Sequence, residues 1–135
     1  MKQIVAFLML ALLVSCSSEE EKEDTKPVKE EVLVEVKNGV YYEWYPGKKQ
    51  LKYKGAQTKD KKRDGIWTFY SENGDELSVT AYEKGMREGF TVVKYPTGVV
   101  HYRGEYHNDQ MVGVWTTFDP KGKVESEKDW GHPAE

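Results

Sequence analysis

The ten residues Gly-Ile-Trp-Thr-Phe-Tyr-Ser-Glu-Asn-Gly, at positions 65–74, decide the fold because their pattern returns along the chain. Equivalent residues are 24 positions apart. Three columns keep this spacing: Gly65, Gly89 and Gly113; Gly74, Gly98 and Gly122; and Tyr82, Tyr106 and Trp130. A tryptophan recurs after two periods, at Trp67 and Trp115. A fixed period of this length indicates a repeat architecture, in which each copy forms one supersecondary unit.

Each copy is predicted to be a β-hairpin. Aromatic and β-branched residues dominate Ile66–Tyr70 and Val114–Phe118, as is typical of strands. The tetrad Asp119-Pro120-Lys121-Gly122 has Asp first, Pro second and Gly fourth, which is the order that a type I turn favours. Ser71–Gly74 and Tyr95–Gly98 keep part of that order. We expect return strands at Glu76–Tyr82, Val100–Tyr106 and Val124–Trp130.

The segments Tyr82–Gly89 and Tyr106–Gly113 are expected to connect successive units. Gly85 and its counterpart Asp109 both suit a left-handed backbone there. An earlier copy, Val40–Gly65, is degenerate, as terminal repeats often are because they cap the array.

These patterns predict an all-β fold. Glycine or proline interrupts the chain too often for a helical stripe. We expect tandem antiparallel β-hairpin repeats with a period of 24 residues, forming one elongated twisted sheet over residues 38–130, with a tail at 131–135. Because a single layer has no thick core, the aromatic side chains of neighbouring hairpins must supply most of the burial.

The beginning of the chain predicts export and lipidation. Lys2 precedes an uncharged run, 4–14, that is too short to span a bilayer but fits a secretory signal at residues 1–15. The sequence Leu13-Val14-Ser15-Cys16 resembles the lipobox of bacterial lipoproteins. That resemblance implies cleavage between Ser15 and Cys16, and acylation of Cys16, the only cysteine. The alternative is an ordinary signal peptide followed by an unrelated cysteine.

A charged linker is expected at residues 16–37. Residues 17–31 hold seven acids, three lysines and no aromatic residue, so they cannot bury enough apolar area to order themselves. The resemblance to lipoproteins implies a bacterial cell envelope protein, anchored by lipid at the outer membrane. Ser17 after the cysteine resembles the outer-membrane default, and the acidic stretch resembles the export signals of surface lipoproteins in Bacteroidetes-type bacteria. A plain solvated linker is the alternative to such a signal.

The repeat itself resembles the MORN family (membrane occupation and recognition nexus), in the bacterial variant found in YwqK-type antitoxin-like proteins. That variant runs G-x-W-x-x-Y-x-x-x-G and then Y-x-x-G-x-x-x-G. The matching residues are Gly65, Trp67, Tyr70, Gly74, Tyr82, Gly85, Gly89, Gly113, Trp115, Phe118 and Gly122. In the middle copy Thr91 and Lys94 depart from the pattern. The resemblance covers about residues 41–130 and implies an architecture rather than a particular ligand.

The sequence indicates no catalytic residue, metal site or cofactor. Cys16 is expected to carry lipid, and the three histidines, His101, His107 and His132, are too dispersed for a site that needs three or four converging ligands. The net charge of −3 does not suggest a nucleic-acid partner. We therefore expect a protein that is not an enzyme, although a hydrolase with an unrecognised site stays as a distant alternative.

Two surfaces are candidates for binding. The first is a basic patch with two interpretations, an electrostatic surface for an anionic partner or a charged edge that blocks further strand pairing. Its residues are Lys48, Lys49, Lys52, Lys54, Lys59, Lys61, Lys62 and Arg63. The second is an aromatic face of Trp67, Phe69, Trp115 and Tyr106, which either packs the hairpins together or holds peptide or sugar.

These observations predict a lipid-anchored module that binds a protein or an envelope component. The antitoxin-like resemblance offers an alternative, an antitoxin or immunity protein. A toxin gene beside this one would favour that alternative.

Overall fold

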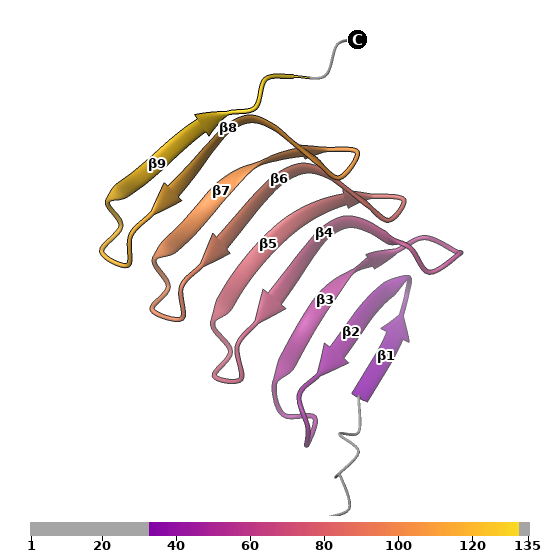
Figure 1. The fold of residues 1–135 in the computed structure, drawn as a ribbon. Coiled ribbons are helices and arrows are strands. Elements are labelled where there is room, and N and C mark those ends of the chain that lie inside the picture. Colours follow the sequence, from indigo (N-terminus) through magenta and orange to yellow (C-terminus); the bar gives the residue numbers. More distant parts are fainter. Residues whose placement is uncertain (1–32, 133–135) are drawn as a thin grey trace, which may run out of the picture.

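The computed structural model describes residues 33–132, which form one open antiparallel sheet of nine strands (Figure 1). Every strand pairs with the strand that follows it, so the spatial order is the sequence order, β1 to β9. The strands are β1 Leu33–Lys37, β2 Val40–Trp44, β3 Leu51–Gln57, β4 Arg63–Tyr70, β5 Glu76–Glu83, β6 Met86–Lys94, β7 Val100–His107, β8 Gln110–Phe118 and β9 Val124–Asp129. The predicted all-β repeat sheet is confirmed. A helix able to cross a bilayer is not found within residues 33–132.

At one end of the sheet, the loops between β4 and β5, between β6 and β7, and between β8 and β9 are the type I turns that the sequence predicts. In the last of them the Gly122 amide donates to the Asp119 carbonyl at 2.9 Å, and Gly122 has a φ of 84°. The Asp119 carboxylate also accepts hydrogen bonds from the amides of Lys121 and Lys123. The same backbone bond closes the turns at Gly74 and Gly98. A glycine is used here because the chain must take a positive φ before it returns.

At the other end, the segments expected to connect units are tight two-residue turns. Lys84 and Gly85 between β5 and β6 both have positive φ, as do Asn108 and Asp109 between β7 and β8. Two consecutive residues with positive φ form a type I′ turn, whose twist matches that of the flanking strands. The chain therefore has no separate connecting segment there, and β6 and β8 begin earlier than expected.

The glycines of the first column lie inside strands, at β-bulges. Arg103 of β7 pairs with Thr116 of β8, and Glu105 pairs with Val112. Between these two pairs β8 has more residues than β7, and Gly113, with a φ of 59°, is one of the extra residues. Gly65 in β4 and Gly89 in β6 occupy equivalent irregularities with φ of 70° and 93°. Such bulges bend a strand and increase its twist. Residues that recur every 24 positions therefore form a bend within a strand as well as the turn between two strands.

The described sheet has little buried core. Only three apolar side chains are buried among residues 33–132, and they are those of Trp67, Val112 and Trp115. Thr91 and Thr116 are buried as well. This confirms that burial comes from side chains packing across neighbouring strands rather than from a second layer.

The beginning of the sheet differs from the expected boundary at residue 38. Strand β1, Leu33–Lys37, lies within the segment expected to be linker and pairs along its length with β2. Its alternating valines give it strand character despite the acidic residues that precede it. The longer loop between β3 and β4 is a turn closed by the amide of Lys61 donating to the carbonyl of Thr58.

Candidate functional site

The four residues of the predicted aromatic face lie on one side of the sheet. Directly opposed residues of paired strands share a face, and residues two apart on a strand do so too. Phe69 therefore shares a face with Trp67, and the register passes from Phe69 through β5, β6 and β7 to Thr117 of β8. Trp115 and Tyr106 lie on that same side, with their rings in contact at 4.9 Å between centroids. We call this side the aromatic face.

Trp67 is enclosed on the aromatic face. Its ring is 5.3 Å from that of Tyr41 and 6.4 Å from that of Tyr82, measured between centroids. The Arg63 guanidinium lies 4.5 Å from the indole centroid and donates a hydrogen bond to the hydroxyl of Tyr82. The indole nitrogen of Trp67 donates to the carbonyl of Ala56 at 2.8 Å. With only 5% of its surface exposed, Trp67 packs the hairpins together and offers no free ring surface.

The second cluster surrounds Trp115 in a similar way. The indole nitrogen donates to the carbonyl of Glu105 at 3.1 Å, and the rings of Tyr102 and Tyr106 flank the indole. The Arg87 guanidinium lies 4.0 Å from the Tyr106 centroid and pairs with Asp109. Burial raises the pKa of the Tyr102 phenol above its usual value.

Next to this second cluster the aromatic face is hollowed into a groove of about 410 Å³. The groove lies over β7, β8 and β9 at the C-terminal end of the sheet. It is lined by Tyr102, Tyr106, Met111, Trp115, Thr117, Ser126, Lys128 and Trp130. We call this the aromatic groove. Its volume is within the range of sites that hold small ligands.

Two substitutions between repeats make room for the aromatic groove. Met111 lies 48 residues, or two periods, after Arg63, so the cation that covers Trp67 has no counterpart over Trp115. Thr117 likewise replaces Phe69, whose ring stacks on Tyr53 at 4.8 Å. A thioether and a small side chain therefore stand where the first cluster has a guanidinium and a ring.

The charge of the aromatic groove is positive. The ammonium of Lys128 lies 3.5 Å from the centroid of the Trp130 ring. Within residues 33–132, no carboxylate side chain lines the groove. The indole of Trp130 is 47% exposed, so part of this ring is open to a ligand.

The predicted basic patch is divided between the two faces and the loops. The ammonium of Lys54 lies 6.0 Å from the ring of Tyr42, on the side opposite the aromatic face, whereas Arg63 covers Trp67. Several of its lysines pair with carboxylates, at Lys48–Glu35, Lys52–Glu43 and Lys62–Asp60. The eight residues therefore do not form one continuous cationic surface.

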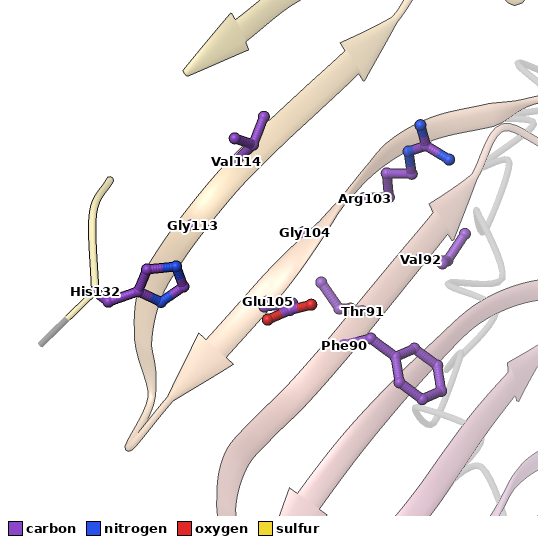
Figure 2. A pocket seen from close by; sticks show the side chains of 9 residues that line it. All are labelled: Phe90, Thr91, Val92, Arg103, Gly104, Glu105, Gly113, Val114 and His132. Carbon is purple, nitrogen blue, oxygen red and sulfur yellow. The ribbon is translucent and has the colours of Figure 1, made fainter. Parts of the chain in front are cut away.

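The opposite face carries an apolar column that the sequence interpretation missed. Ile66, Phe90 and Val114 are 48%, 47% and 56% exposed, and each follows a bulge glycine. Their 24-residue spacing was a signal that could have revealed them. A hollow of about 420 Å³, similar in volume to the aromatic groove, lies between Phe90 and Val114, with Arg103, Glu105 and the tail residue His132 around it (Figure 2).

The histidines remain apart. His101 stacks on Tyr95, with 4.3 Å between the ring centroids, and His107 bonds the carboxylate of Glu88 at 2.9 Å. No group of three metal-ligating side chains occurs in the described part of the chain. Cys16, Ser15 and the predicted signal and linker up to residue 32 lie outside the described residues, as do residues 133–135 of the predicted tail.

Comparisons with known proteins give no further assignment. No family model, curated protein or solved structure matches this chain.

Proposed function

We propose that this protein is a lipid-anchored binding module that holds a component of the cell envelope in the aromatic groove. The observation that carries the proposal is the groove itself, formed by exposed Trp130 with Tyr102, Tyr106 and Met111 beside a positive charge. Aromatic residues that combine a large apolar surface with a polar tip are frequent in binding sites. The groove lies near the C-terminal edge, whereas the proposed anchor is at the other end of the chain, at Cys16.

Cross-linking in intact cells tests the binding proposal. A photoreactive amino acid replaces Ser126, which lines the groove, and in a second strain replaces Ser78. Ser78 is the matched control because it lies two periods earlier on the same face, beside the enclosed Trp67 cluster. We expect a specific envelope component to be captured from position 126 and not from position 78. Equal capture from both positions, or capture from neither, would contradict the proposal.

The anchor has a separate test. Cys16→Ser removes the thiol that the lipid requires, so labelling with a radioactive fatty acid should be lost and the protein should leave the membrane fraction. Lipid chains hold a protein at the membrane because each buried methylene contributes about 0.8 kcal/mol. Unchanged membrane retention of Cys16→Ser would refute the anchor and leave the groove proposal standing.

A further inference from the structure

From the lining of the aromatic groove we infer its ligand class: an anionic saccharide. This inference rests on the proposed function, because it names the chemistry of the component that the groove would hold. Three features of the described residues fit such a ligand: the rings, the hydroxyl groups and the sign of the charge.

The rings give the groove an apolar floor and wall. Tyr102 and Tyr106 flank the buried indole of Trp115, and the partly exposed indole of Trp130 stands at the β9 side. Flat rings of this kind match the C–H faces of pyranose sugars, which present apolar patches between their hydroxyl groups. The volume of about 410 Å³ suits one to two sugar rings of a longer chain that continues across the open face.

Hydroxyl groups accompany the rings. Thr117 of β8 and Ser126 of β9 are directly opposed and both line the groove. Neither hydroxyl takes part in a side-chain hydrogen bond within residues 33–132. Each can both donate and accept, as a sugar hydroxyl requires. A proline-rich peptide also prefers aromatic grooves, but its tertiary amides offer only acceptors, so it uses this pair of hydroxyl groups less fully.

The positive charge of Lys128 favours an anionic ligand over a cationic one. Lys128 already occupies a face of Trp130, at 3.5 Å from the ring centroid, so the cation–π position that a cationic ligand would take is filled. Because no carboxylate of the described residues lines the groove, the ammonium group is free to form a charge-assisted hydrogen bond with a carboxylate or phosphate on the sugar. A uronic acid and a sugar phosphate supply the same chemistry.

The test is a titration of saccharide and peptide probes into the full chain held in detergent micelles. Binding is monitored by tryptophan fluorescence and by saturation-transfer NMR. The probes are trigalacturonic acid, its fully methyl-esterified form, glucose 6-phosphate and decaproline. We expect the acid to bind more tightly than its neutral ester, and Lys128→Gln to weaken binding of the acid about fivefold and binding of the ester by less. The matched control is Lys121→Gln, in the turn beyond the groove, which should change neither. Glucose 6-phosphate binding would show that phosphate serves as the anion.

A second variant fills the groove with a side chain that an earlier repeat already has at the equivalent position. Thr117→Phe introduces the side chain that the chain itself uses two periods earlier, at Phe69, so the sheet should still form. We expect it to abolish binding of the acid, with the circular dichroism spectrum unchanged. The inference is overturned if the ester binds as well as the acid, if only decaproline binds, if none of the probes binds at millimolar concentration, or if folded Thr117→Phe binds normally. Cross-linking from position 126 to a protein, with no saccharide binding, would overturn this inference and leave the proposed function intact.

Discussion

Two glycines make room for the rings of the two buried tryptophans. Gly55 and Gly104 lie directly beneath the rings of Trp67 and Trp115, and a Cβ at either glycine would overlap the indole. Both glycines have ordinary backbone angles, so the space they leave, rather than their flexibility, is what the fold uses. In the middle repeat the chain has Thr80 opposite Thr91 instead, with their hydroxyls 2.7 Å apart. Successive repeats therefore fill this cross-strand position with one of two residue pairs, either a tryptophan ring over a glycine or two threonines.

This pairing predicts non-additive stability changes. Gly104→Thr alone should destabilise the sheet by roughly 1–3 kcal/mol, because the new side chain overlaps the Trp115 ring. Trp115→Thr alone should cost about 3–5 kcal/mol through lost packing. The double variant recreates the pair found at Thr80 and Thr91, so its penalty should be smaller than the sum by about 1–3 kcal/mol. Urea unfolding followed by circular dichroism measures all three, and strictly additive values would contradict the pairing.

Asp109 makes a pH-dependent contribution to stability. Its carboxylate accepts hydrogen bonds from the backbone amide and the side chain of Arg87, and these bonds lower the pKa of Asp109. Since the folded pKa lies below the unfolded value of about 3.9, the contribution is present above that value and is lost as the pH falls through the folded pKa.

Asp109→Asn tests that contribution. Asparagine keeps the left-handed backbone of the turn, where φ is 65°, but removes the charge. We expect the variant to be less stable than the parent at pH 7 and closer to it at pH 3, when both are compared by urea unfolding. Glu72→Gln, which removes one negative charge from an exposed turn, is the matched control. If the free energies of unfolding of Asp109→Asn and the parent differ by the same amount at both pH values, the Asp109 carboxylate is not the source of the pH-dependent stability.

At the scale of elements, the two-residue turns fix the register of the hairpins. Gly85 has a φ of 97°, whereas its counterpart Asp109 reaches the same left-handed region with a side chain. Gly85→Ala should therefore cost about 1–2 kcal/mol, because alanine has no polar group to offset the left-handed conformation. Gly85→Asp should cost less, since the chain uses aspartate at that place in the next repeat. Chemical denaturation distinguishes the two, and equal losses would show that backbone strain does not decide the turn.

The sequence predicts some elements better than others, for physical reasons. The turn Asp119-Pro120-Lys121-Gly122 was predictable because each residue satisfies one geometric demand of a type I turn. The role of Gly113 was not, because a glycine with positive φ serves a connecting turn and a β-bulge equally well, and only the pairing with β7 separates them. Similarly, the shared face of Trp67 and Phe69 follows from strand alternation, whereas the groove depends on what Met111 and Thr117 leave open across three strands.

At the scale of the whole molecule, the sheet is a one-dimensional array. Each strand pairs only with its sequence neighbours, and the described sheet does not close on itself, so β1 and β9 are both edges (Figure 1). Stability is then expected to depend on interfaces between adjacent repeats. The aromatic groove lies at one end of this array, where β9 pairs only with β8 among the described residues and Trp130 is partly exposed.

An open array must prevent its edges from pairing with other copies, and β9 is built to do so. All six of its residues are exposed, and four of them, Glu125, Glu127, Lys128 and Asp129, are charged. Charged side chains on an edge strand oppose the addition of another strand. The variant Glu125→Thr/Glu127→Thr replaces two of these charges with a good strand former. It should associate in a concentration-dependent way in analytical ultracentrifugation, whereas Glu72→Thr, in the turn between β4 and β5, should behave like the parent. If the double variant has the parent's sedimentation profile at every concentration, β9 charge is not what keeps the edge unpaired.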